Sequence, residues 1–399
     1  MSFAPSELRK QIEDLSSEIE VQKAVLEDLI HRRRQTQHNL NAVLDPMARL
    51  PLELQSKIFV HCLCFDEDGR ASKPDPQLAP MIFSNVCQLW REIALSTPEL
   101  WTHLRIESAP GGANYSQLYE VWLERSRPLP VSLTLEGTSD LAEGVKHFID
   151  CSACRVEEFS LLLLTDLHYQ YRVPLLPFRS LKKLHIVLEE EKSFRTHDWI
   201  DVMRMSPGLL HCTFSASFSL HVIGEDFEPF TLTALTELHL KERLSSNPGN
   251  VNPTILFRYI TLPALERLHI HCRLTLPSLP DVVNDLSDFI IRSDPPLRSL
   301  VIDDSGSDWV AILERLAAPS LLPNLQHLAC RRRIWERRDL EVFVRMLDMW
   351  SLKTFRLNIT SIRFCDGAAV PDEDMLVELR RIRDSGVDIY IGDEQRNFV

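Results

Sequence analysis

The sequence predicts a mixed α and α/β fold in three parts: a long N-terminal coiled-coil helix, a small all-α domain, and a repetitive α/β solenoid with parallel strands. Three observations support this prediction. Apolar residues recur in steps of three and four over residues 8–43, two amphipathic segments follow within residues 45–106, and a Leu-x-x-Leu-x-Leu phrase then returns along the rest of the chain. With 399 residues, 44% of them hydrophobic, the chain is long enough for two or three globular units.

The first 44 residues carry a heptad pattern of about five repeats. Its positions are Leu8, Ile12, Leu15, Ile19, Gln22, Leu26, Leu29, Arg33, Thr36, Leu40 and Val43. Isoleucine at position a with leucine at position d favours a parallel dimer, and Glu18 and Lys23 would attract each other across its interface. The polar interruptions, together with Val25 and Ile30 on the flanks, fit equally well a helix that packs on the chain's own body. The sequence leaves both arrangements open.

Residues 45–106 contain two apolar stripes at helical spacing. Pro51 suits the first turn of a helix, where its missing N–H costs nothing, and Pro98 ends the second helix. The stripes consist of Leu50, Leu54, Ile58 and Phe59, followed by Val86, Leu89, Trp90, Ile93 and Ala94. Prolines and charges predict a loop at about residues 65–80. Such a short helical segment makes a small core, so we expect part of its apolar surface to contact another protein.

The order of residues in this segment is also typical of a known interaction domain. It runs through Leu50-Pro51, Glu53, Leu54, Ile58, Phe59, Val86-Cys87, Trp90 and Pro98-Glu99-Leu100-Trp101. In this order the segment resembles an F-box, with the loop at 65–80 as an insertion. The resemblance implies a domain that binds a Skp-family adaptor and, through it, a cullin. The residues that it assigns to adaptor binding are Leu50, Pro51, Leu54, Ile58, Phe59, Val86, Trp90 and Leu100.

The rest of the chain repeats one phrase at steps of 25 to 32 residues. Its clearest copies begin at Leu181, Leu235, Leu265, Leu297, Leu325 and Leu352, weaker ones begin at Val156 and Leu209, and Trp101 and Pro130 fall in register. Amphipathic segments lie between the copies, at residues 198–205, 281–291, 308–316 and 339–350. The pattern resembles leucine-rich repeats, in which strand and helix units stack into a curved solenoid. We expect a leucine-rich-repeat-like domain over residues 107–399, closed by a cap at 375–391.

Alternation within each predicted strand separates a buried set of side chains from an outward set. The leucine pairs would be buried, and the residues between them would form the concave face, which we take as the candidate target-binding face. Its residues are His185, Thr213, Ser215, His239, Lys241, His269, His271, Asp303, Arg331, Arg356 and Asn358.

Composition excludes several classes of protein. The net charge of −13 argues against sequence-independent nucleic-acid binding, and the absence of a run of 18 apolar residues argues against a membrane span. The N-terminus lacks the pattern of a secretory signal. Nine scattered cysteines indicate a reducing compartment, either cytoplasmic or nuclear. Cys151 and Cys154 with His147 could supply zinc ligands or a redox pair, but they fit better as structural thiols at a helix end.

The sequence also predicts a protein without catalytic chemistry. It has 12 glycines and lacks the phosphate-binding motifs G-x-G-x-x-G and G-x-x-x-x-G-K-S/T and the nucleophile elbow G-x-S-x-G. His239, His269 and His271 could approach one metal ion, but outward positions between leucines are ordinarily solvated. We therefore expect neither a metal nor a cofactor.

Taken together, the three parts resemble fungal F-box proteins with an N-terminal coiled coil and degenerate leucine-rich repeats. That resemblance implies the substrate-recognition subunit of an SCF-type cullin ubiquitin ligase, which binds an unknown target protein through the repeats and has the potential to form a homodimer through residues 8–43. Two alternatives stay open: a ligand-sensing receptor of the same architecture, and a ligase-independent interaction scaffold.

Overall fold

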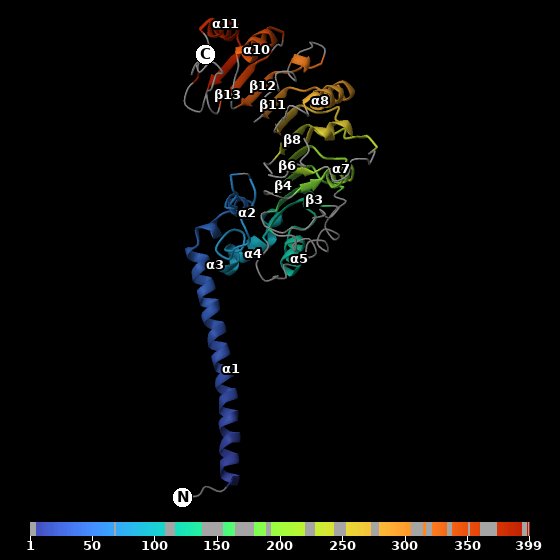
Figure 1. The fold of residues 1–399 in the computed structure, drawn as a ribbon. Coiled ribbons are helices and arrows are strands. Elements are labelled where there is room, and N and C mark those ends of the chain that lie inside the picture. Colours follow the sequence, from blue (N-terminus) through green and yellow to red (C-terminus); the bar gives the residue numbers. More distant parts are fainter. Residues whose placement is uncertain are drawn as a thin grey trace. The chain divides into compact units, whose positions relative to one another are not determined.

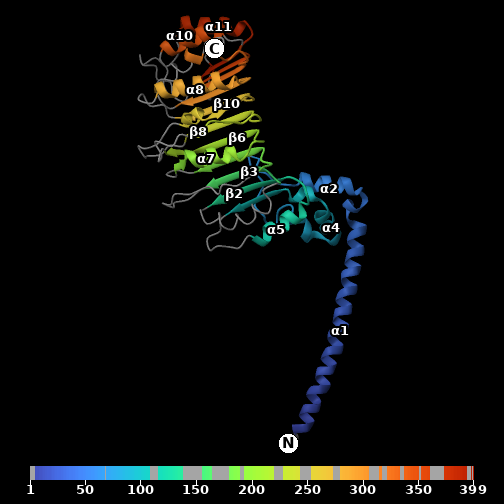
Figure 2. The same ribbon diagram turned by 90° about the vertical axis from the view of Figure 1, so that its right-hand side faces the viewer.

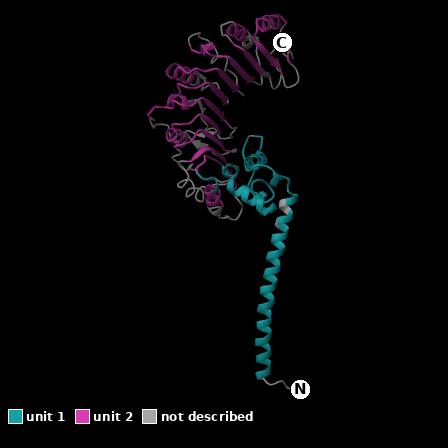
Figure 3. Cartoon of the chain, turned by 180° about the vertical axis from the view of Figure 1, so that it is seen from behind, with its two compact units in different colours: residues 1–102, 125–127 teal, residues 103–124, 128–399 magenta. Residues whose placement is uncertain are grey.

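The computed structural model of the protein describes residues 5–67, 69–107, 116–137, 155–163, 179–188, 193–219, 228–242, 253–272, 279–304, 314–316, 321–332, 337–349, 352–359, 373–392, 397 and 399. The chain forms two compact units (Figure 3). Unit 1 comprises residues 1–102 and 125–127, and unit 2 comprises residues 103–124 and 128–399. The boundary therefore precedes residues 103–106, which the sequence had assigned to the small helical domain.

Unit 1 begins with one long helix, α1 (Pro5–Leu44), drawn in blue in Figure 1. The described apolar side chains of its heptad pattern are exposed. Packing of this helix on the body of unit 1, one of the two arrangements left open by the sequence, is thus not seen in the described residues. None of the described helices is long and apolar enough to cross a membrane.

The remainder of unit 1 is a cluster of short helices. Its elements are η1 (Pro46–Arg49), α2 (Leu52–His61), α3 (Phe83–Val86), α4 (Gln88–Ser96) and η2 (Pro98–Trp101). Proline stands at the start of η1 and η2, where its missing N–H is not needed. Asp45 caps η1 by accepting a hydrogen bond from the Met47 N–H at 2.8 Å.

Unit 2 is built on one large parallel sheet. Eleven strands follow one another in chain order: β1 (His103–Glu107), β2 (Val131–Gly137), β3 (Val156–Leu163), β4 (Lys183–Leu188), β6 (His211–Ser219), β8 (Glu237–Glu242), β10 (Arg267–Cys272), β11 (Ser299–Asp304), β12 (His327–Arg332), β13 (Thr354–Ile359) and β14 (Asp388–Gly392). A short strand, β5 (Ser193–Arg195), also pairs with β6, and β7 (Phe230–Thr231) pairs with β9 (Ile260–Thr261). This order confirms the predicted α/β domain with parallel strands.

The helices of unit 2 lie between successive strands along the chain. They are α5 (Ser116–Arg125, whose last residue belongs to unit 1), α7 (Thr196–Arg204), η3 (Pro253–Arg258), α8 (Leu279–Ser293), α10 (Arg337–Met349) and α11 (Glu373–Asp384). Three of them, α7, α8 and α10, overlap amphipathic segments that the sequence predicts, and α11 overlaps the predicted cap at residues 375–391. Figures 2 and 3 show the strands of unit 2 stacked along an arc, with helices on its outer side.

The core of unit 2 lies between the sheet and these helices. Two rows of side chains that alternate with the outward positions are buried, for example Leu238 and Leu240 in β8. Aromatic pairs join helix to strand or helix to helix: Trp199 of α7 lies edge-on to Phe214 of β6, with ring centroids 6.1 Å apart, and Phe257 of η3 stacks on Phe289 of α8 at 4.5 Å. Aromatic rings bury large apolar areas, so these contacts fix α7 on the sheet and η3 on α8.

Candidate protein-binding surfaces

The small helical cluster of unit 1 has a core of three aromatic rings. Phe59 of α2 stacks on Phe83 of α3 with centroids 4.1 Å apart, and Trp90 of α4 lies 5.1 Å from Phe59. Ile93 and Leu100 are each only 1% exposed and complete this core. The three rings join α2, α3 and α4 across the 65–80 insertion, which is why a long loop between the first two helices is tolerated.

Buried polar groups hold the chain around these rings. The Trp90 indole N–H donates to the Asp45 carboxylate at 2.6 Å, so the residue that caps η1 also anchors α4. The amide of Gln55, which is 6% exposed, donates to the backbone carbonyls of Met47 and Leu50 at 2.7 and 2.8 Å. These bonds satisfy buried polar groups that would otherwise be unpaired, and they fix the position of the backbone at Met47 and Leu50, just before α2.

The structure corrects the predicted adaptor-binding set at two positions. Phe59 and Leu100 are each 1% exposed, so they pack the core of unit 1 and are not available for direct contact with a partner. Pro51, Leu54, Ile58 and Val86 are exposed, and Leu50 and Trp90 are partly exposed. The predicted set therefore divides into a surface group and a supporting core.

The surface of unit 1 also exposes apolar residues that the sequence analysis did not select. Leu52 is 55% exposed and Ile82 is 37% exposed, beside Leu54 at 46% and Ile58 at 41%. Leu54 and Ile58 are four residues apart on α2 and so share one side of that helix, whereas Gln55 and Phe59 share the buried side. Leu52 was missed because it lies seven residues before Phe59, so periodicity alone places it on the buried side of α2.

The inserted loop has local order of its own. The Asp66 carboxylate accepts hydrogen bonds from the Arg70 backbone N–H at 2.9 Å and from its guanidinium at 3.0 Å, and Phe65 pairs with Ala71 in an antiparallel bridge. Gly69 has a positive φ of 75°, which suits the tight turn between them.

In unit 2 the outward side chains form three parallel rows across the strands. The first row runs His211, Glu237, Arg267, Ser299 and His327; the second runs His185, Thr213, His239, His269, Val301, Ala329 and Arg356; the third runs Val187, Ser215, Lys241, His271, Asp303, Arg331 and Asn358. Every residue of the predicted face lies in the second or third row. The strand register thus brings together residues from β4 to β13 that are far apart in the sequence.

Most of this face is accessible. His185, Thr213, His239, His269, His271 and Asp303 are partly exposed, and Lys241, Arg331 and Arg356 are exposed. Ser215 is the exception, with an exposed fraction of 6%, so its short hydroxyl lies below its neighbours and contributes little contact surface. The side chain of Asn358 lies outside the described residues, although its backbone pairs with Arg331.

The first row contains a charged centre that the sequence analysis missed. The Glu237 carboxylate contacts the Arg267 guanidinium at 2.6 Å, His211 Nδ1 at 3.1 Å and His239 Nε2 at 3.0 Å. Burial alone would raise the pKa of Glu237, but the hydrogen bond and charge of Arg267, with the two histidines, hold it below its usual range. Glu237 stands two residues before His239. Continuing the alternation of outward residues in β8 by one position towards the N-terminus would therefore have identified it.

A second charged centre lies between the second and third rows. The Asp303 carboxylate is 3.2 Å from His269 Nε2 and 3.6 Å from His271 Nδ1. The ring of His239 packs edge-on against that of His269, with centroids 5.2 Å apart. Within the part of the chain that the structure describes, no group of three or more His, Cys, Asp or Glu side chains is arranged to hold a metal ion.

Lowering the pH is expected to weaken unit 2 through Asp303. Burial alone would raise the pKa of this carboxyl, but contacts with His269 and His271 hold it well below its usual range. Because the folded-state pKa is depressed, the ionised carboxylate stabilises the fold at pH values above the unfolded pKa of about 4, and this contribution is lost as the pH falls further. Asp303→Asn should therefore destabilise the protein by about 1–2 kcal/mol at pH 7.

The check is chemical unfolding of wild type and Asp303→Asn at pH 7, 5 and 3. The difference in free energy of unfolding should be smaller at pH 3 than at pH 5 or pH 7. Asp388→Asn is the matched control, since Asp388 is exposed and its carboxylate lies 3.6 Å from the Arg356 guanidinium. A difference that grew towards low pH would contradict the assigned direction of the shift.

Cys62, Cys64, Cys87, Cys212 and Cys330 are free thiols, and Cys212 and Cys330 belong to the buried rows of the sheet. Burial raises the pKa of Cys212 to about 12 and also raises that of Cys330, so both thiols stay protonated and unreactive. Cys151, Cys154 and His147, considered above as zinc ligands or a redox pair, lie outside the described residues.

Comparison with known proteins identifies no family for this chain. No family model matches it, and none of the curated proteins does so either. Among solved structures, a Bacteroides fragilis protein determined as a structural-genomics target aligns with 72% of this chain and 73% of its own, at 14% sequence identity and a TM-score of 0.28. Similarity at this level supports no conclusion about function.

Proposed function

We propose that this protein is the substrate-recognition subunit of an SCF-type cullin ubiquitin ligase. Unit 1 would bind a Skp-family adaptor, and the outward rows of unit 2 would bind the target protein. The observation that carries the proposal is the exposure of Leu54 and Ile58 on α2, in the segment whose residues resemble an F-box. Large apolar side chains left on the surface of a small domain are typical of a protein interface.

The aromatic core explains how this surface would be presented. Phe59 and Phe83 are buried and Trp90 is partly exposed, and the contacts among these three rings fix α2 and α4 relative to each other within unit 1. Leu54 and Ile58 project from the exposed side of α2, about 100° around the helix from Gln55 and Phe59. A preorganised apolar side on a rigid helix reduces the entropy lost on binding.

In this proposal the protein carries out no bond chemistry. Its contribution is proximity, because holding a target near a ubiquitin-charged enzyme replaces a bimolecular encounter by a local one. The mixed rows of unit 2 suit target recognition, because in two of them a carboxylate stands between basic side chains. Glu237 lies between His211 and Arg267 in the first row, and Asp303 lies between His271 and Arg331 in the third. Such a pattern gives specificity through charge complementarity.

Replacing Leu54 and Ile58 by lysine is expected to abolish adaptor capture. Loss of two apolar anchors should weaken binding by about 3 kcal/mol or more, which is over a hundredfold in affinity. Both side chains are exposed, so the free energy of unfolding should change by less than about 1 kcal/mol. The measurement is co-purification of the tagged chain with a purified Skp-family adaptor and its cullin.

The matched control is Ile291→Lys with Val377→Lys, which places the same charges on exposed apolar positions of α8 and α11 in unit 2. This control should capture the adaptor as wild type does. Undiminished capture by the Leu54→Lys/Ile58→Lys variant would refute the assignment of this surface. If even the wild-type chain captured no adaptor, the ligase-independent scaffold would become the better explanation.

A further inference from the structure

The long helix α1 exposes an ordered row of apolar side chains. Leu8, Ile12, Leu15, Ile19, Gln22, Leu26 and Leu29, here called the seam, occupy successive a and d positions of the heptad pattern. Its apolar members are 45–62% exposed in the described part of the chain, so unit 1 does not cover them. A 40-residue helix is about 60 Å long. An apolar row in heptad positions along such a helix is the kind of surface that packs against a second helix.

We propose that α1 binds a second copy of this chain, forming a parallel, in-register coiled coil over residues 8–30. This inference goes beyond adaptor and target binding and does not depend on either. The residues along the seam and on its flanks complement their own equivalents, which favours a second copy of this chain over another helix.

The core positions favour two parallel strands. Ile12 and Ile19 occupy a positions, while Leu15 and Leu29 occupy d positions, a distribution that selects two-stranded parallel coils. Gln22 lies at a d position between them. In a parallel dimer in register, the two Gln22 side chains meet, and each amide donates a hydrogen bond to the other. Shifting the register would place Gln22 against an apolar residue and leave its amide unpaired.

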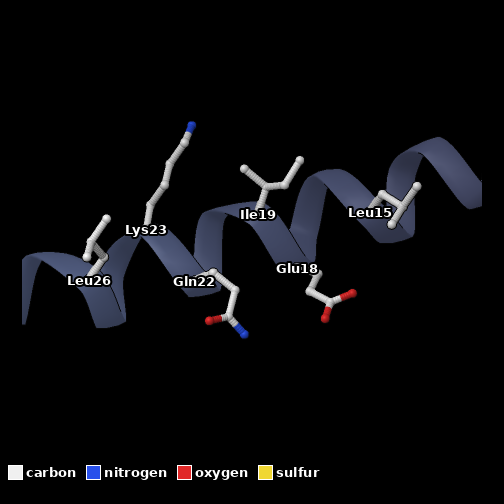
Figure 4. Close-up of a pocket in the computed structure, with 6 residues that line it drawn as sticks. All are labelled: Leu15, Glu18, Ile19, Gln22, Lys23 and Leu26. Carbon is white, nitrogen blue, oxygen red and sulfur yellow. The ribbon is translucent and has the colours of Figure 1, made fainter.

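The flanks of the seam are self-complementary as well. A shallow hollow on α1 is lined by Leu15, Glu18, Ile19, Gln22, Lys23 and Leu26. Figure 4 shows Glu18 and Lys23 leaving the helix on opposite sides of this row. Glu18 stands at position g and Lys23 at the following e. In a parallel dimer, Glu18 of each copy therefore pairs with Lys23 of the other copy, which gives two such ion pairs per dimer.

In the single chain, Lys23 bonds to a different residue. Its ammonium group contacts Glu20 at 2.8 Å, with both side chains more than 60% exposed, and such a surface pair contributes little. The ammonium is therefore free to exchange Glu20 for Glu18 of the second copy at small cost. One heptad further, Val25 and Ile30 form the next g and e pair, which extends the apolar contact beyond the core.

The sequence also indicates where the pairing ends. Arg33 occupies the next a position, where two copies would bring two guanidinium groups together in the core. Residues beyond 30 are therefore expected to diverge. An antiparallel pair would place g beside g and e beside e, so the attraction between Glu18 and Lys23 would be lost.

The first test is the solution mass of the full chain. Wild type should have twice the 46.0 kDa mass of one chain by light scattering, and Ile19→Lys should have the mass of one chain. Val21→Lys is the matched control: Val21 is 58% exposed and Ile19 is 52% exposed on the same helix, but Val21 lies on the side away from the seam. It should remain a dimer.

The second test exchanges charges across the proposed interface. Glu18→Lys alone and Lys23→Glu alone place like charges opposite each other in both flanking pairs, so each variant should dimerise about tenfold more weakly. Mixing the two variants restores both attractions in the heterodimer, and the double exchange restores them in the homodimer. Recovery in both cases supports the parallel second copy, since no other occupant predicts it.

Three outcomes would overturn the inference. A wild-type chain of single mass at micromolar concentration excludes the second copy. A dimer that survives Ile19→Lys must form through another surface. Charge exchanges without recovery on mixing exclude the parallel register. Adaptor capture is measured separately with Leu54→Lys/Ile58→Lys, so failure of one proposal is distinguishable from failure of the other.

Discussion

Phe59→Ala is expected to unfold the helical cluster of unit 1. The Phe59 side chain is 1% exposed and lies between two other rings, 4.1 Å from Phe83 and 5.1 Å from Trp90. Removing it leaves a cavity at the point where three helices meet, which costs about 3–5 kcal/mol. A helical cluster of this size has a small free energy of unfolding, so a loss of this magnitude is enough to unfold it. We expect the variant to lose its cooperative unfolding transition in unit 1 while unit 2 keeps its own.

The measurement is hydrogen exchange followed by mass spectrometry, which reports the two units separately. Amides of α2 and α4 should lose protection in Phe59→Ala, whereas those of β8 and β10 should not. Leu52→Ala is the matched control, because Leu52 is 55% exposed on the same helix and its removal should leave protection unchanged. Full protection of α2 in Phe59→Ala would show that Phe59 is not a core residue.

Phe214→Ala should produce the largest local loss of stability in unit 2. Phe214 is fully buried in β6, and its ring lies edge-on to Trp199 of α7 with centroids 6.1 Å apart. Its removal takes away the main aromatic contact between this helix and the sheet, at a cost of about 3–5 kcal/mol. In stacked repeats each unit contacts mainly its neighbours, so the damage should centre on β4, β6 and β8.

Thr213→Ala provides the comparison for this variant, because Thr213 is the adjacent residue of the same strand but belongs to the outward second row. Its effect on the free energy of unfolding should stay within about 0.5 kcal/mol. Hydrogen exchange of the α7 and β6 amides measures both variants. Equal effects of the two substitutions would mean that the assignment of buried and outward rows is wrong at β6.

The sheet was predictable from the sequence because its signal has a period of two. In β8 the alternation of Leu238 and Leu240 with His239 and Lys241 distinguishes the two faces without ambiguity. The spacing of the repeats then implies parallel strands in chain order. The same alternation predicted which residues point outward. Their contacts across strands could not be predicted, because those contacts depend on the strand register, which only the structure shows.

The surface of unit 1 was harder to predict because α2 has apolar residues on both sides. Leu54 and Ile58 are exposed while Gln55 and Phe59 are buried, so hydropathy alone assigns Gln55 to the wrong side. Gln55 is buried because its amide bonds to the carbonyls of Met47 and Leu50, a tertiary arrangement that no periodicity encodes. The same limit explains why Phe59 was grouped with the surface anchors.

The regular order of the strands in unit 2 has a consequence for how this protein can change over evolutionary time. Each outward residue is separated along its strand from the buried residues that determine the fold, and each strand is joined only to its immediate neighbours in the sheet. Substitutions at outward positions can therefore accumulate one by one while the scaffold is inherited intact. Duplicated copies of such a gene could acquire different partners without passing through unfolded intermediates.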